Sequence, residues 1–161
     1  MSELVACQRI VNQLQLQFNA LGLTTEIEDE MVDQKRCDIT IQHNIGGRIR
    51  LLVVEVKGQW HKDIFTAAGE QLEERYMGHP NAEDQGVYLA LWYGPDVLVA
   101  NVKNTALKSA LDLKQSIESY ISDALLKRID VVVLDLSKSK SRRIKDSKKK
   151  ASKKKASKKK R

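Results

Sequence analysis

The segment of residues 36–58, RCDITIQHNIGGRIRLLVVEVKG, places the strongest constraint on how this chain can fold. Gly46 and Gly47 lie between two runs rich in apolar and β-branched residues. This is the pattern of a two-residue β-hairpin turn, because glycine tolerates the positive φ that such turns need. With these glycines as the loop, the pairing continues outward until Asp38 lies opposite Glu55. The sequence therefore predicts a hairpin that brings two carboxylates onto one face.

Two opposed acids on a strand pair need a compensating positive charge, because like charges with Cβ atoms only about 5 Å apart destabilise the pairing. Lys57 follows Glu55 by two residues and, since side chains alternate along a strand, projects to the same face. The gap between the acids also suits a divalent cation, because Mg²⁺ is commonly held by one or two carboxylates together with water and phosphate oxygens. Asp38 and Glu55 are therefore predicted metal ligands, and Lys57 is placed to orient or deprotonate a metal-activated water.

Asp38, Glu55 and Lys57, with sixteen residues between the first two, resemble the motif of the PD-(D/E)XK nuclease superfamily. Cys37 stands where that motif usually has proline, and the resemblance covers residues 2–92. It implies a restriction-endonuclease-like core of order α-β-β-β-α-β and a catalytic role for the three residues. It also implies Mg²⁺ or Mn²⁺ as the cofactor and metal-dependent hydrolysis of phosphodiester bonds in nucleic acid, with DNA favoured.

The resemblance extends to residues on the neighbouring helices. Nuclease branches of the superfamily often carry a catalytic-site glutamine on the helix after the lysine strand, and Gln71 has a similar position. In the better-known version a tyrosine follows that glutamine by four residues, whereas Tyr76 follows it by five. Several members also place a glutamate on the first helix as a further ligand. The third acidic ligand stays open among Glu3, Glu26 and Glu28.

A second interpretation of Asp38, Glu55 and Lys57 is an ion cluster on the surface of a sheet, in which the lysine neutralises two acids. The chain would then be a catalytically inactive nucleic-acid-binding or assembly module on a nuclease-like fold. Retention of all three residues favours the nuclease. The choice between DNA and RNA is left open, as are a homodimer and a subunit of a larger defence or repair assembly.

Apolar periodicity predicts the elements on either side of the hairpin. They are helix 4–21, strand 23–28, helix 61–77, strand 87–93, helix 105–128 and strand 131–134. The apolar stripe of the first helix is expected to pack against the sheet, with a dimer seam as the less favoured alternative. The last two strands lack alternation, which is typical of strands covered on both faces. Residues 1–136 are thus predicted to be one α/β domain, a nuclease-like core with an additional C-terminal helix and strand.

Length and composition fit this interpretation, because 161 residues with 42% apolar content suit one domain with a sizeable core. Neither a run of about 18 apolar residues nor a basic start followed by an apolar segment occurs, so no membrane span or secretory signal is predicted. Cys7 and Cys37 form no zinc-spaced cluster with the histidines and are expected to be buried free thiols. A cytoplasmic location is predicted, associated with the nucleoid in a prokaryote.

The composition changes abruptly at Ser137. Residues 137–161 contain twelve lysines, three arginines and one aspartate, a net charge of +14, whereas residues 1–136 carry thirteen basic and twenty acidic side chains, a net −7. A KKKAS repeat buries too little apolar surface to offset its ordering entropy, so a disordered arm is predicted. Its lysines would attract nucleic acid by neutralising phosphates and releasing counterions. An anionic membrane surface or, in a nucleated cell, an import signal are the alternatives.

Overall fold

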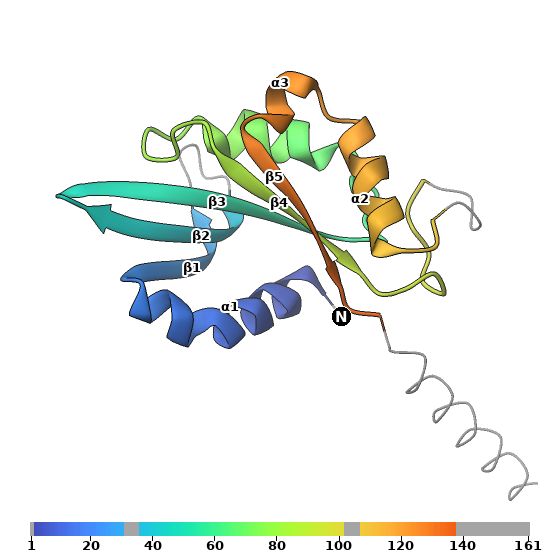
Figure 1. Ribbon diagram of the computed structural model, residues 1–161, viewed down its shortest axis with the longest axis horizontal. Coiled ribbons are helices and arrows are strands. Elements are labelled where there is room, and N and C mark those ends of the chain that lie inside the picture. The colour runs from blue at the N-terminus through green and yellow to red at the C-terminus, as the bar shows by residue number, and fades with distance from the viewer. Residues whose placement is uncertain (1, 31–35, 102–106, 138–161) are drawn as a thin grey trace, which may run out of the picture.

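The computed structural model describes residues 2–30, 36–101 and 107–137, and its strands form one mixed sheet between two layers of helices (Figure 1). The elements are α1 (Glu3–Ala20), β1 (Leu23–Glu30), β2 (Arg36–Ile45), β3 (Arg48–Gly58), the π-helix η2 (Ala68–Met77), β4 (Gly86–Trp92), α2 (Ala110–Ser119), α3 (Asp123–Leu126) and β5 (Ile129–Asp135). The sheet has the order β1-β2-β3-β4-β5. The first three strands are antiparallel, and β4 and β5 run parallel to β3. The predicted α/β class is confirmed.

The turn of the β2–β3 hairpin lies where the two glycines predict it. Gly46 has a φ of +59° and Gly47 a φ of +84°, the left-handed values that a tight hairpin turn needs. The Gly47 N–H donates a hydrogen bond of 3.0 Å to Oδ1 of Asn44. From this turn the paired residues run from Ile45 with Arg48 to Ile39 with Val54, which is the predicted register.

The regular pairing of β2 with β3 ends one rung before Asp38 and Glu55, so the direct pairing expected for these two residues is not formed. The β1–β2 pairing also skips the rung of Glu28 and Asp38, and Glu28 has a left-handed φ of +55°. Cys37 is buried in the cluster on the face covered by η2, α2 and α3, whereas Ile39 is buried on the opposite face, beneath α1. The side-chain alternation of β2 therefore breaks at Asp38, because the chain bends there.

We expect Glu28→Gly to be more stable than Glu28→Ala by about 1 kcal/mol, because a left-handed φ is costly for any residue that carries a Cβ. Both substitutions remove the same carboxylate, so the comparison isolates the backbone. The free energy of unfolding in urea measures the difference. Equal stability of the two variants would show that the backbone at Glu28 is not strained.

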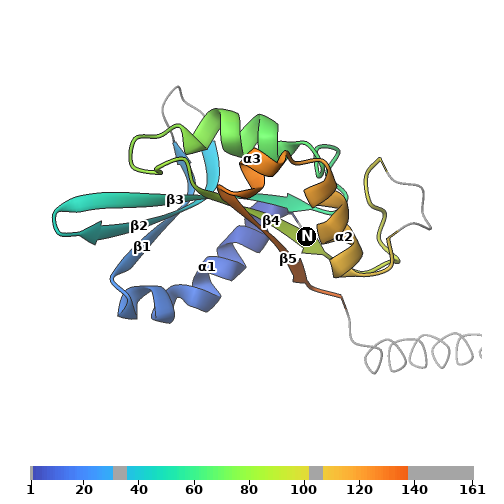
Figure 2. The same cartoon turned by 45° about the horizontal axis from the view of Figure 1, so that its top comes forward.

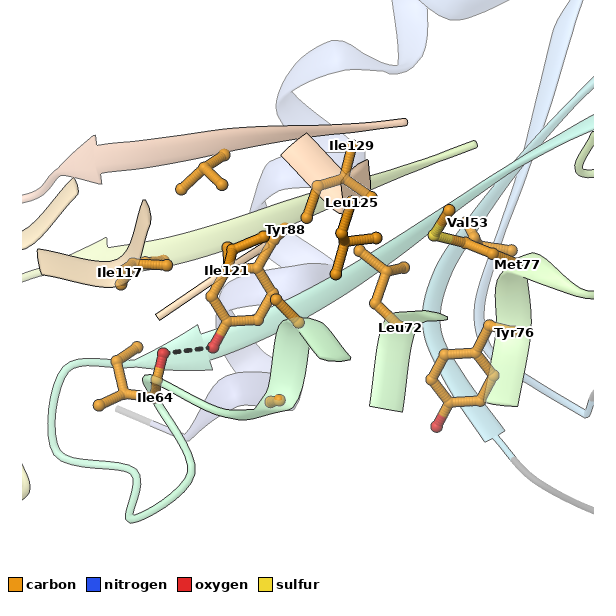
Figure 3. Packing of buried hydrophobic residues seen from close by; sticks show 14 of the residues in the cluster. Val53, Ile64, Leu72, Tyr76, Met77, Tyr88, Ile117, Ile121, Leu125 and Ile129 are labelled. Carbon is orange, nitrogen blue, oxygen red and sulfur yellow. Dashed lines mark hydrogen bonds between the residues drawn. The ribbon is translucent and has the colours of Figure 1, made fainter. Parts of the chain in front are cut away.

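Helix α1 covers one face of the sheet, and η2, α2 and α3 cover the other (Figure 2). An apolar cluster lies on each face. The larger cluster lies beneath η2, α2 and α3 and includes Leu72, Tyr88 and Ile117. Figure 3 shows that the Tyr88 hydroxyl donates a hydrogen bond to the Ile64 carbonyl, at 2.8 Å. The smaller cluster lies beneath α1 and contains Ala6, Cys7, Val11, Ile39, Val54, Val56 and Leu91. Together the two clusters hold the middle of β3 between two covered faces.

The first helix, predicted over 4–21, is confirmed as Glu3–Ala20, but the other two predicted helices are shorter than their apolar patterns suggest. The helix expected over 61–77 is a π-helix that begins only at Ala68, and residues 62–66 form turns. The helix expected over 105–128 was wrong as a single element, because α2 ends at Ser119 and α3 begins at Asp123. Its first residues, up to 106, lie outside the described residues. Ser122 caps α3 by accepting a hydrogen bond from the Leu125 N–H, an interaction that favours the start of a new helix.

The face of the sheet under α1 is less covered than expected. Leu14 on α1 is 37% exposed, and Val132 and Leu134 on β5 are 43% and 37% exposed. The prediction that the last strand is buried was wrong, because β5 is an edge strand that has one open face. A groove of about 570 Å³, lined largely by apolar side chains, lies between the part of α1 from Arg9 to Phe18 and the sheet. Only the first half of α1, which carries Cys7 and Val11, packs tightly.

Both cysteines are buried and form no disulfide, as predicted. No helix in the described ranges is long and apolar enough to cross a membrane. The predicted basic arm lies, apart from Ser137, outside the described residues.

Candidate active site

Asp38, Glu55 and Lys57 converge where β2 bends at Asp38, at the end of the hairpin that lies away from the Gly46-Gly47 turn. The Lys57 ammonium hydrogen-bonds the Glu55 carboxylate and lies 3.9 Å from Oδ2 of Asp38. The same Oδ2 accepts a hydrogen bond of 2.7 Å from the Val56 N–H, which ties Asp38 to β3 after the regular pairing has ended. The structure thus brings together the three residues that the sequence singled out. The hydrogen bond from the Val56 N–H to the Asp38 side chain replaces the predicted backbone pairing of Asp38 with Glu55.

Glu3 reaches this cluster from α1. The Ser2 hydroxyl caps the helix by accepting a hydrogen bond from the Val5 N–H, so Glu3 lies in the first turn. Oε1 of Glu3 accepts a hydrogen bond of 2.8 Å from the N–H of Gly58, the residue after Lys57. The Glu3 charge contributes to the pKa values of all three cluster residues. Among the acids left open by the sequence, Glu3 is therefore held beside the cluster.

The other two acids left open lie on β1, and both are exposed. Glu28 stands at the skipped rung beside Asp38, and its charge helps to raise the pKa of that carboxyl group. Glu26 lies opposite Thr40, two residues farther from the bend. Glu28 thus borders the cluster, whereas Glu26 lies outside it.

Asp38 and Glu3 are the members of the cluster that solvent reaches. The side chains of Glu55 and Lys57 are only 2% and 7% exposed, whereas that of Asp38 is 27% exposed. Glu3 is half-buried. A ligand that enters the cluster must therefore approach past Asp38 and Glu3.

Burial dominates the proton affinities of the cluster. It raises the pKa of Glu55 to about 7, with the charge of Asp38 adding to the shift and Lys57 opposing it. Burial also raises the pKa of Asp38, against the hydrogen bond from Val56. Burial alone would lower the pKa of Lys57, but Glu55, together with the charges of Asp38 and Glu3, outweighs burial, so this pKa lies above its ordinary value. With Glu3 nearby, three carboxyl groups share one ammonium, and ionised Glu55 leaves an excess of buried negative charge.

The raised pKa of Glu55 predicts that stability falls as the pH rises from 4.5 to about 7. In this window the unfolded chain has released the Glu55 proton while the folded chain still holds it, and stability falls wherever the folded state binds more protons. The shift corresponds to a loss on the order of 3 kcal/mol. Urea unfolding of wild type and Glu55→Gln across this pH range tests the prediction, because the variant should lose this part of the slope. An unchanged slope would contradict the burial-driven pKa.

The cluster offers carboxylate oxygens, which suit Mg²⁺ or Mn²⁺, whereas zinc sites usually take nitrogen and sulfur ligands. Within the described part of the chain, no group of three or more His, Cys, Asp or Glu side chains is arranged to hold a metal ion. Mg²⁺ needs only one or two carboxylates and keeps several waters. Asp38 and Glu55 are the residues that would hold it, and a divalent cation would offset their buried charge.

Gln71 lies on η2, and no hydrogen bond among the described residues joins it to the three charged residues of the cluster. Tyr76, on the same helix, does interact electrostatically with the cluster. Burial raises the pKa of Tyr76 to about 12, and the charge of Glu55 adds to this shift. Hydrogen bonds in a π-helix join residues i and i+5. Tyr76 therefore stands one turn after Gln71 despite the five-residue spacing.

Gln59 is a buried polar residue that the sequence did not reveal. Its side-chain amide donates hydrogen bonds to the carbonyls of Gly94, at 3.1 Å, and Val97, at 2.7 Å, and accepts one from the Tyr93 N–H. These contacts fix residues 93–97 against the end of β3, directly after Lys57. Every partner is a backbone group more than thirty residues away, so no local pattern could have predicted them.

Comparisons of the chain with protein-family models, with curated proteins and with solved structures give no match. The fold and the cluster define a mixed α/β protein in which a buried glutamate, a buried lysine and a partly exposed aspartate meet on a β-hairpin.

Proposed function

We propose that this chain is a metal-dependent nuclease of the PD-(D/E)XK superfamily, built on a restriction-endonuclease-like core. Its reaction is the hydrolysis of phosphodiester bonds in nucleic acid, with DNA as the favoured polymer. The observation that carries the proposal is the Lys57 ammonium, hydrogen-bonded to Glu55 and 3.9 Å from Asp38 at the bend of the hairpin. This arrangement supplies the carboxylates for a cation and a cationic group beside the reacting phosphate, both of which phosphodiester hydrolysis needs.

A purely structural ion cluster accounts less well for the same geometry. Buried ion pairs are a weak source of stability, and leaving buried charge unbalanced destabilises a fold. Here three carboxyl groups share one ammonium, and the pKa of Glu55 is raised to about 7. Strongly shifted pKa values that arise from burial and a charged neighbour are typical of functional sites. The cluster thus costs stability, and catalysis explains why such a cost is kept.

Each residue of the cluster has a distinct role in the proposed reaction. A bound Mg²⁺ or Mn²⁺ ion supplies a water of lowered pKa and positive charge beside the phosphate. Asp38 and Glu55 are the residues that would hold it. Lys57 donates hydrogen bonds and so orients a water or a phosphate oxygen. Glu3, beside Gly58, adds a carboxylate acceptor that solvent reaches.

Residues 1–136, the acidic body, and residues 137–161, the basic arm, have different roles in the proposed binding of nucleic acid. Residues 1–136 carry a net charge of −7, so they repel phosphates except where a cation is bound, whereas residues 137–161 carry +14. Phosphate neutralisation by lysine gives an attraction that is independent of sequence. The arm therefore holds the nucleic acid near the body, and the cluster acts on it.

Incubation of the purified full chain with linear duplex, circular duplex, single-stranded DNA and RNA tests the proposal. Cleavage of at least one substrate is expected in Mg²⁺ or Mn²⁺ and none in EDTA. With circular duplex, nicking would point to a subunit that acts alone, and linearisation to paired subunits. Absence of metal-dependent cleavage of every substrate would overturn the nuclease and favour an inactive nucleic-acid-binding or assembly module.

A further inference from the structure

We propose that Trp60 stacks on a nucleobase, so that the substrate of this chain carries an unpaired base beside the phosphate to be cut. This inference rests on the proposed nuclease function and adds the substrate class: single-stranded nucleic acid, or a duplex with an unpaired end, flap or junction.

The indole of Trp60 lies against the backbone of Gly58, the residue that follows Lys57. A Cβ built at Gly58 would lie only 2.5 to 2.7 Å from three ring atoms of Trp60, so the indole can lie this close only because residue 58 has no side chain. The N–H of the same glycine donates the hydrogen bond to Glu3. Because side chains alternate along β3, the indole lies on the face of the strand opposite to Lys57, next to Glu3, which is one of the two solvent-accessible carboxyl groups of the cluster.

Trp60 is supported by its neighbours but remains open to solvent. The ring of Tyr93 lies 5.2 Å from the indole, centroid to centroid, at an angle of 49°. The segment that carries Tyr93 is itself pinned by Gln59, whose side chain accepts a hydrogen bond from the Tyr93 N–H. Trp60 nevertheless stays 38% exposed, whereas Trp92 is 1% exposed. Single exposed apolar residues are common on protein surfaces, so the exposure gains meaning only from this fixed position beside the cluster.

An aromatic surface suits this particular opening because of its charge. The body is acidic, and the solvent-facing residues of the cluster, Asp38 and Glu3, are carboxyl groups. These carboxyl groups oppose the approach of a phosphate, so a contact that is independent of charge is favoured beside them. Stacking of a base on an aromatic ring does not depend on phosphate neutralisation, and it tolerates any base because each has a π-face. An unpaired base can turn onto the indole, whereas a base within a duplex must first leave its stack.

Tryptophan fluorescence tests the inference without cleavage. The chain has only two tryptophans, and buried Trp92 provides a constant background. The full chain is titrated in EDTA with a single-stranded oligonucleotide and with a blunt duplex, at a salt concentration that weakens the contribution of the arm. We expect the single strand to quench Trp60, in wild type and in Trp92→Phe. Trp60→Leu should lose roughly 5- to 100-fold in affinity for the single strand and little for the duplex.

Trp60→Phe serves as the matched control, because phenylalanine keeps a ring for stacking and should retain most of the affinity. Thermal unfolding of each variant shows whether the fold is intact. Equal single-strand affinity of folded Trp60→Leu and wild type, without quenching in wild type, would overturn the inference, as would failure of the single strand to bind. Quenching without metal-dependent cleavage would leave stacking in place and overturn the nuclease. If wild type cleaves but shows no quenching, and Trp60→Leu loses no affinity, stacking alone would be overturned and the nuclease would stand.

Discussion

Asp38→Asn and Glu55→Gln should each lower the rate of metal-dependent cleavage by roughly 10³-fold or more, because a metal ion contributes several kcal/mol to stabilising the charge of the transition state. Both substitutions keep the shape of the side chain and remove its negative charge. Affinity for nucleic acid should change little, since the proposed holding of the strand by the basic arm does not involve these residues. Initial rates at saturating DNA and fluorescence anisotropy in EDTA measure the two quantities separately.

Glu83→Gln is the matched control for this pair. Glu83 is an exposed acid, 51% accessible at its side chain, and its ion pair with Arg50 lies outside the cluster. The variant should cleave at the wild-type rate. Lys57→Ala should lose most of the turnover but still bind the metal. Wild-type rates in Asp38→Asn and Glu55→Gln would show that these acids are not part of a catalytic site.

Deleting residues 137–161 should weaken binding to all sequences alike, by roughly 10³-fold at low salt if six or more phosphate contacts are lost. The plot of log affinity against log salt should also flatten, because each lost contact removes about 0.9 units of slope. The arm carries fifteen basic side chains, so it can supply that many contacts. Fully extended, it reaches roughly 80 Å, far beyond the body. Turnover at saturating substrate should change much less, since the arm contains none of the proposed catalytic residues.

A variant with the twelve lysines of the arm replaced by glutamine keeps the length of the chain and removes most of the charge. It should behave like the truncation if the effect is electrostatic. A truncation that leaves both affinity and salt slope unchanged would mean that the arm serves an acidic protein or a membrane surface. The body would then bind nucleic acid through a basic surface of its own.

The hairpin could be predicted from the sequence because its determinants are local. Two adjacent glycines fix the turn, and strand alternation then fixes which residues pair as far as Ile39 and Val54. The prediction failed where alternation fails, at the bend marked by Glu28 and Asp38. The left-handed φ of Glu28 could not be predicted from the sequence, because glycine and asparagine are the residues that normally indicate such a φ.

The parts of the site that the sequence left open depend on contacts between distant segments. Glu3 meets Gly58 only because α1 packs its first turn against the end of β3, and Gln59 meets the backbone of residues 93–97 across the sheet. The π-helical turn of η2, which places Tyr76 one turn after Gln71, also departs from any α-helical pattern. Apolar content predicted β5 as buried because it cannot distinguish a central strand from an edge strand.

Binding of Mn²⁺, followed by electron paramagnetic resonance at a pH above the raised pKa of Glu55, tests the central claim most directly. Wild type and Glu83→Gln should bind the ion equally, and Asp38→Asn and Glu55→Gln should each bind it more than about tenfold more weakly, since each removes a charged oxygen ligand. Binding to wild type should also weaken as the pH falls below about 7, when Glu55 takes up its proton. Equal Mn²⁺ binding by all four proteins, or no binding to wild type, would contradict a metal site at Asp38 and Glu55.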